Sequence, residues 1–142
     1  MNYRRCFRTS LIALAAWSAM TSTLAADAAT DQAQMHEQAA SLPTVQRAAA
    51  AALGVAPPRV EVHSRAHQLT VSVVDAANAS SRSHDAQTVV GAVERAIDGR
   101  RGFDQVMLIH VDFVTRAGKG ARIVKGFDFN RSPSGSFVPH TT

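Results

Sequence analysis

The segment Asp104-Gln-Val-Met-Leu-Ile-His-Val-Asp-Phe-Val-Thr115 gives this 142-residue chain its strongest β-strand signal. Its side chains follow a period of two, which places successive residues on opposite faces of a strand. The row that we expect to face a core consists of Met107, Ile109, Val111 and Phe113. The opposite row mixes apolar and titratable side chains and consists of Val106, Leu108, His110, Asp112 and Val114. The sequence therefore predicts a strand that is buried on one face and open on the other.

A second strand is expected to return beside this one over residues 122–129, after a turn at residues 117–120. The residues that would pair with the core-facing row are Ile123, Phe127 and Phe129. This pairing needs a loop with an odd number of residues, as a glycine bulge provides. Lys125 then falls on the inner row too, which indicates either a sheet edge or another register.

Two shorter alternating runs, residues 59–65 and 67–75, predict a hairpin earlier in the chain. The pairs that a tight turn around Arg65-Ala66 would bring together are Val62 with Leu69 and Val60 with Val71. All of these apolar residues then lie on one side, and this agreement supports the pairing.

One helix is predicted before each pair of strands. The first has Ser41 as its N-cap and Pro43 in its first turn, and it ends before Gly54. The second begins near Ser83 and stops at Gly99. The order αββαββ predicts a two-layer α+β fold, with a four-stranded antiparallel sheet and two helices on one face.

The first 26 residues have the three parts of a bacterial signal peptide. A basic start with a twin arginine, Arg4-Arg5, precedes an apolar stretch at residues 11–20 and small residues at 21–26. The general secretory route and the twin-arginine route both stay open. We therefore expect a periplasmic or secreted protein with no stable membrane insertion after cleavage. The segments expected beyond residues 1–26 are a polar leader, flexible or helical, at 27–40, a single α+β domain at 41–129 and an irregular tail at 130–142.

The charge balance and the cysteine content exclude several classes of function. Three of the 15 basic residues and none of the 11 acidic ones lie in the signal segment, so the remainder carries 12 basic and 11 acidic side chains. Binding of nucleic acid needs clustered Lys and Arg, and this near-neutral, alternating pattern argues against it. The one cysteine, Cys6, lies in the signal segment, which excludes thiol catalysis and disulfides from the mature domain.

The predicted sheet leaves one face without helices, and that face carries an apolar group. The candidate partner-surface residues are Val74, Val106, Leu108, Val114 and Val124. Exposed apolar patches on small domains mark interaction surfaces. We therefore expect a protein partner or a homodimer through this face, although the leader or the tail could cover it instead.

The candidates for catalysis lie on the same face. His110 and Asp112 are two residues apart on one strand, and Asp128 is available on its neighbour as a third group. A carboxylate beside an imidazole orients it and raises its pKa. The usual nucleophile, zinc-protease, phosphate-loop and dinucleotide motifs are absent from the sequence, and we expect no metal or cofactor.

The sequence therefore favours a small exported, non-enzymatic binding or interaction module that uses its open sheet face. One alternative is a small hydrolase or metal-dependent enzyme centred on His110 and Asp112. Another is a polyanion-binding protein, which requires five arginines to converge on one surface. These arginines are Arg65, Arg100, Arg101, Arg122 and Arg131.

Overall fold

The computed structural model describes residues 18–76, 79–118 and 120–140. The chain divides into two compact units, residues 1–33 and 34–142. Most of the expected signal peptide, residues 1–17, lies outside the described residues. None of the helices in the described part of the chain is long and apolar enough to cross a membrane.

The first helix, α1 (Ser18–Leu53), starts well before the predicted N-cap. The expected leader at residues 27–40 belongs to this helix, and its residues 27–33 are exposed. Ser41 is therefore not an N-cap, and Pro43 lies inside the helix. The Ser41 side chain is buried, and its hydroxyl accepts a hydrogen bond from Arg100 Nη1 at 3.1 Å. A serine two residues before a proline resembles a helix start in sequence, but here its hydroxyl makes a tertiary contact.

The second unit contains a single five-stranded sheet in the order β1-β2-β3-β4-β5. Its strands are β1 (Val60–Arg65), β2 (Gln68–Val74), β3 (Leu108–Ala117), β4 (Gly120–Arg131) and β5 (Phe137–Pro139). The α+β class and the two helices are as predicted, but the fully antiparallel four-stranded sheet is wrong. Strands β2 and β3 are parallel, whereas all other neighbours are antiparallel.

The parallel pair follows from the helix between β2 and β3. Helix α2 (Arg82–Ile97) has 16 residues, which at 1.5 Å per residue spans roughly 24 Å. This length is close to that of the seven-residue β2, at about 3.3 Å per residue. The helix therefore returns the chain to the end where β2 began, and β3 must run in the same direction as β2.

The tail also differs from the prediction, because it is not irregular throughout. Strand β4 continues to Arg131, and β5 then pairs with its last three residues. Phe137 in β5 is buried, and the Arg131 guanidinium lies 5.7 Å from the centre of its ring. The fifth strand was missed because three residues, the last of which is Pro139, are too few to show an alternation.

The first hairpin has the predicted faces but a register shifted by two residues. Val62 pairs with Val71, and Val60 with Val73. The turn lies at Ala66-His67 instead of Arg65-Ala66, and Ala66 adopts a φ of 50°. Because the shift is even, every side chain stays on its predicted face.

Strand β3 starts four residues later than predicted, because a short helix precedes it. Helix η2 (Arg101–Phe103) leads into a turn in which the Val106 amide donates to the Phe103 carbonyl. Phe103 and Val106 are three residues apart, so in this turn their side chains lie on the same side, and both are buried. Met107 is 54% exposed. The assignments of Val106 to the open row and of Met107 to the core row are therefore both wrong.

Helix η2 also carries a glycine that the packing requires. A Cβ atom on Gly102 would lie 2.8 Å from the Gln38 nitrogen and 2.9 Å from the Gln34 carbonyl oxygen of α1. Backbone atoms cannot yield as a flexible side chain does. The loop before β3 therefore packs directly against the backbone of α1.

A β-bulge in β4 changes the second hairpin. Phe113 pairs with Lys125, but Val114 pairs with Ile123, so Val124 is an extra residue on β4. The bulge moves Ile123 from the predicted core row to the open row, where it is 61% exposed. Lys125 pairs with a core residue beyond the reach of β5, and it lies at a sheet edge.

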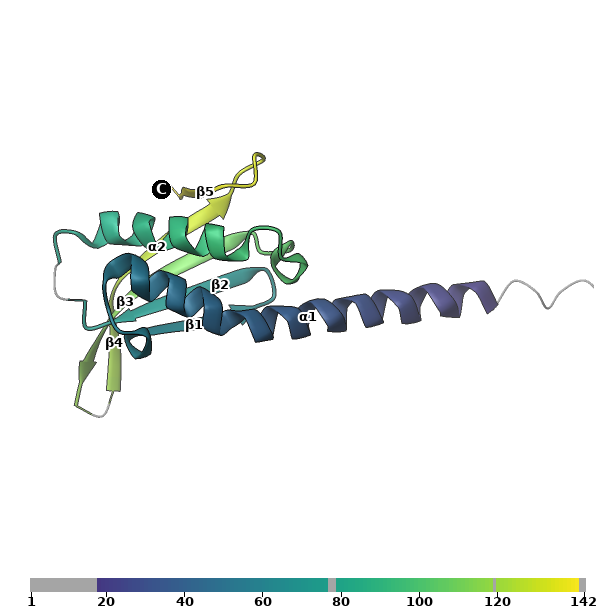
Figure 1. The fold of residues 1–142 in the computed structure, drawn as a ribbon, viewed down its shortest axis with the longest axis horizontal. Helices are drawn as coiled ribbons and strands as arrows, with labels where there is room; N and C mark the ends of the chain where they lie inside the picture. The colour runs from purple at the N-terminus through teal and green to yellow at the C-terminus, as the bar shows by residue number, and fades with distance from the viewer. Residues whose placement is uncertain (1–17, 77–78, 119, 141–142) are drawn as a thin grey trace, which may run out of the picture. The chain divides into compact units, whose positions relative to one another are not determined.

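The core lies between the sheet and both helices (Figure 1). Its helix residues come from the second half of α1 and from α2, and its strand residues all belong to the rows that face those helices. The buried strand residues are Val60, Leu69, Val71, Val73, Ile109, Val111, Phe113, Phe129 and Phe137. A short helix, η1 (Pro57–Arg59), joins α1 to β1. The opposite face of the sheet is the open face.

Candidate functional site on the open face

The pairing register arranges the open face in four rows that cross the strands. The two central rows are polar and consist of His63, Thr70, His110 and Asp128, then of Glu61, Ser72, Asp112 and Gly126. The two outer rows contain the apolar residues and consist of Arg65, Gln68, Leu108, Asn130 and Val138 at one end, then of Val74, Val114 and Ile123 at the other. A polar band therefore crosses the middle of the sheet between two partly apolar ends.

His110 lies at the centre of this band, on the middle strand, and is held by two carboxylates. Its Nε2 hydrogen-bonds to Asp112 Oδ1 at 2.8 Å, and its Nδ1 hydrogen-bonds to Asp128 Oδ1. Asp112 is on the same strand two residues away, and Asp128 is directly opposite on β4. An ionised carboxylate only accepts hydrogen bonds, so both ring nitrogens can donate to the two carboxylates only when the ring is protonated. The geometry therefore favours the imidazolium over the neutral ring.

The electrostatics agree with this protonation state. Burial of the ring lowers the pKa of His110, but the hydrogen bond to Asp128 and the charge and hydrogen bond of Asp112 outweigh burial. The net effect raises the pKa above its ordinary value of 6.5. The side chain of Asp112 is 9% exposed, that of His110 26% and that of Asp128 47%. The cluster thus has a buried end at Asp112 and a solvent-facing end at Asp128.

Gly126 leaves the space that the imidazole occupies. A Cβ atom there would lie 3.1 Å from Asp112 Oδ1 and from His110 Cε1. These contacts are tighter than ordinary van der Waals packing. The imidazole therefore lies over a position without a side chain, and any larger residue would displace it or Asp112.

The candidate partner-surface residues differ in their accessibility. Val124, at the bulge, is 44% exposed, and Leu108 and Val114 are half-buried. Val74 belongs to the open face but is 6% exposed, and Val106 is 1% exposed within the core region. Three of the five predicted residues therefore remain available at the surface of the second unit.

Two exposed apolar residues of this face were not predicted from the sequence. Ile123 was assigned to the core, and only the bulge moves it outward. Val138 belongs to the undetected β5, where it is 45% exposed and pairs with Asn130. Gly126 was missed as well, although an isolated glycine within a strand is a known sign of close packing.

The five arginines considered for polyanion binding do not gather on one surface. Arg65 lies in the row next to Leu108 at one end of the sheet, and Arg122 pairs with Thr115 at the other. Arg100 and Arg131 line a pocket near the end of α2. Arg122 thus lies at the other end of the sheet from Arg65, so the five arginines do not converge as that alternative requires.

The His110 cluster is poorly arranged for acid–base catalysis. A general base needs a free lone pair, and a general acid needs a proton that points at substrate. Both ring nitrogens of His110 are occupied by carboxylates. The described part of the chain also contains no group of three or more His, Cys, Asp or Glu side chains that could hold a metal ion.

Comparison with known proteins does not assign the chain to a family. No family model matches it, and no curated protein or solved structure is significantly similar to it.

Proposed function

We propose that this protein is a small exported, non-enzymatic binding module whose open sheet face docks a protein partner. It acts in the periplasm or outside the cell, after removal of the signal peptide. The observation that carries the proposal is the composition of the open face. Apolar side chains at both ends flank a polar band whose charges are held in place.

The apolar part supplies the affinity of such a contact. Ile123, Val124 and Val138 are each between 44% and 61% exposed. Apolar side chains grouped on one face of a small domain and bordered by polar ones are typical of interaction surfaces. The helices cover the other face, so docking here requires no rearrangement of the core.

The polar band determines which partner fits. Asp128 is half-exposed, and one of its oxygens is engaged by His110. Glu61, 53% exposed, lies in the adjacent row on β1, with β2 and β3 between it and Asp128. A partner with a Lys or Arg side chain between apolar residues complements the exposed carboxylate of Asp128. The hydrogen bond to His110 keeps this carboxylate in place.

Site-specific crosslinking tests the proposal. A photo-crosslinking residue at position 123, on the open face, should give a discrete protein adduct in the periplasm. The same residue at position 87, which is exposed on α2, should not. Leu108→Lys should abolish the adduct, because an ammonium in an interface core is poorly tolerated. Equal crosslinking from both positions would contradict the proposal.

The enzyme alternative makes a different prediction for the same surface. If His110 is catalytic, His110→Gln removes a hydrolytic activity that Leu108→Lys and Val124→Lys leave intact. If the face is a docking surface, the two Lys variants lose the adduct and no such activity depends on His110. Size-exclusion chromatography of the same variants shows whether the partner is a second copy.

A further inference from the structure

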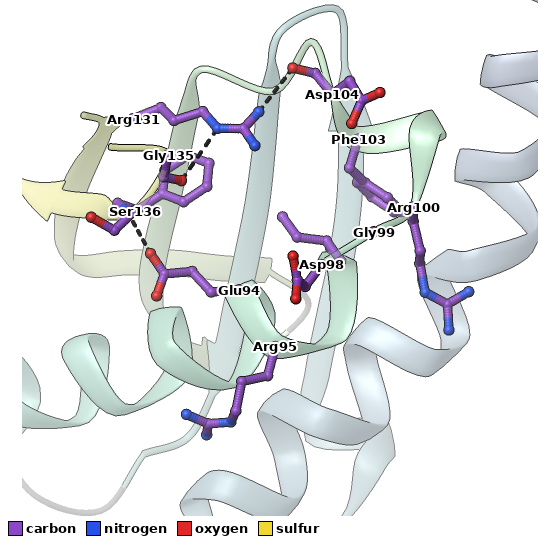
Figure 2. A pocket seen from close by; sticks show the side chains of 12 residues that line it. Glu94, Arg95, Asp98, Gly99, Arg100, Phe103, Asp104, Arg131, Gly135 and Ser136 are labelled. Atoms are coloured by element: carbon purple, nitrogen blue, oxygen red, sulfur yellow. Dashed lines mark hydrogen bonds between the residues drawn. The ribbon is translucent and has the colours of Figure 1, made fainter. Parts of the chain in front are cut away.

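A pocket lies away from the open face, between the end of α2, helix η2 and the turn before β5 (Figure 2). Its volume is about 270 Å³, slightly below the ~300 Å³ at which pockets for drug-sized ligands begin. Its lining includes the buried apolar residues Ile97, Phe103 and Phe137. The pocket thus has the size and floor for a small molecule with one apolar group.

One wall of the pocket carries two carboxylates, whereas the guanidinium groups of Arg95 and Arg100, which also belong to the lining, point away from the pocket in Figure 2. Glu94 and Asp98 are four residues apart at the end of α2, so their side chains lie on the same side of the helix. Glu94 Oε1 accepts a hydrogen bond from the Phe137 backbone amide, which fixes the carboxylate. Neither carboxylate has a cation within ion-pair distance among the described residues. The carbonyl end of α2 adds partial negative charge at the same place.

The opposite side of the pocket carries Arg131, which Figure 2 shows across from α2. Its Nη1 donates to the Asp104 carbonyl at 2.8 Å and to the Val106 carbonyl at 3.4 Å, and its Nε donates to the Gly135 carbonyl at 3.3 Å. These acceptors are neutral, and no carboxylate of the described residues forms an ion pair with Arg131. Its Nη2 donates to none of the described residues. The guanidinium is held in place by these carbonyls and by the Phe137 ring, and it has no ion-pair partner among the described residues.

We propose that this pocket binds a free α-amino acid with an apolar side chain. The ammonium group lies against Glu94 and Asp98, and the carboxylate accepts hydrogen bonds from Arg131. The side chain covers Phe103 and Phe137. A zwitterion satisfies both walls at once, whereas a simple cation or anion satisfies only one. This site shares no residue with the open face. A failure of amino-acid binding would therefore not affect the proposed docking function, and the reverse is also true.

Isothermal titration calorimetry on the full chain tests the proposal with four probes. L-Leucine and L-phenylalanine carry both charges, 4-methylpentanoic acid lacks the ammonium, and 3-methylbutylamine lacks the carboxylate. At least one of the two amino acids should bind saturably, and both truncated analogues should bind at least about tenfold more weakly, because each loses a charge-assisted hydrogen bond. No binding of either amino acid, or equal binding of an analogue, would overturn the proposal.

Two substitutions in the negative wall sharpen the test. Asp98→Asn changes an exposed residue, and Glu94→Gln keeps an oxygen for the Phe137 amide, so both variants should fold. Each should weaken amino-acid binding about tenfold or more, with circular dichroism as the folding control. Glu37→Gln, on the exposed part of α1, is the matched control and should bind as the wild type. Unchanged binding in both wall variants would also overturn the proposal.

Discussion

The two faces of β3 are stabilised in different ways, although both belong to the same strand. On the helix-facing side, Ile109, Val111 and Phe113 are all at most 1% exposed and need only to be apolar and to fit. On the open side, His110 and Asp112 occupy equally central positions and depend on particular partners across the sheet. The helix-facing side is stabilised by burial of apolar side chains, and many combinations of apolar residues can provide this burial. The second face depends on the positions of particular side chains, so a small change in one of them should alter the stability of the domain.

The largest effect should come from a charge on the helix-facing side. Val93 in α2 is fully buried, so Val93→Asp places an unpaired carboxylate in the core. We expect a loss on the order of 5 kcal/mol, comparable with the total stability of a small domain. Circular dichroism should show an unfolded chain at 25 °C. Arg95→Ala, an exposed position two residues away, should leave the melting curve almost unchanged.

A smaller effect is expected from the centre of the open face. His110→Gln removes the cation between Asp112 and Asp128 and should cost about 2 kcal/mol at pH 6. Because folding raises the pKa of His110, its stabilising contribution is complete below pH 6.5 and is lost as the pH rises through the folded pKa. Urea unfolding from pH 5.5 to 9.5 should therefore show a difference between wild type and variant that shrinks with increasing pH.

A histidine outside the cluster is the control for that series. The side chain of His63 lies on the same face but is 72% exposed. His63→Gln should cost little at any pH, because an exposed side chain with one distant charged neighbour contributes little. A difference for His110→Gln that stays constant with pH would mean that the imidazolium is not the stabilising species.

The close packing around the imidazole can be tested with a single methyl group. Gly126→Ala places a Cβ atom 3.1 Å from two atoms of the cluster and should cost about 1–2 kcal/mol. Gly120→Ala, on the same strand, meets nothing within 4 Å and should cost less than about 0.5 kcal/mol. Thermal unfolding of both variants measures the difference. Equal melting temperatures would show that the site tolerates the methyl group.

The smallest effect on stability is expected at the apolar end of the open face. Val124 is an exposed residue on the bulge, so Val124→Lys should change the unfolding free energy by less than about 0.5 kcal/mol. The variant should nevertheless lose the partner adduct. A cooperative loss of folding in this variant would mean that the bulge region belongs to the core and not to a docking surface.

The comparison also explains how much of the fold could be predicted from sequence. Alternation over Ile109, Val111 and Phe113 identifies the helix-facing side of β3 correctly, because burial leaves a periodic pattern. The parallel pairing of β2 and β3 was missed, because it depends on the direction in which α2 returns the chain. The start of β3 was misplaced because the spacing between Phe103 and Val106 follows a helical turn.

Prediction of the candidate site was limited for a related reason. Parity alone places His110 and Asp112 on one face, and the neighbouring strand makes Asp128 available. It cannot show that both ring nitrogens are engaged, since this depends on the register that sets Asp128 opposite His110. The isolated Gly126 signals close packing within a strand, but the sequence does not show that the His110 imidazole is the group packed there. Sequence thus identifies the members of the cluster but not its protonation or its packing.

The bulge in β4 has a consequence for behaviour at high protein concentration. Strand β5 pairs with the last three residues of β4, and the His140 amide donates to the Asp128 carbonyl. Among the described residues, no strand pairs with the outer edge of β4 before Asp128. Such edges can pair with another copy and lead to fibrils. Here Val124 interrupts the regular ladder and Lys125 adds a charge beside it. An unbroken β4 with an apolar residue at position 125 would present a straight edge, and the protein would then be prone to strand-by-strand assembly.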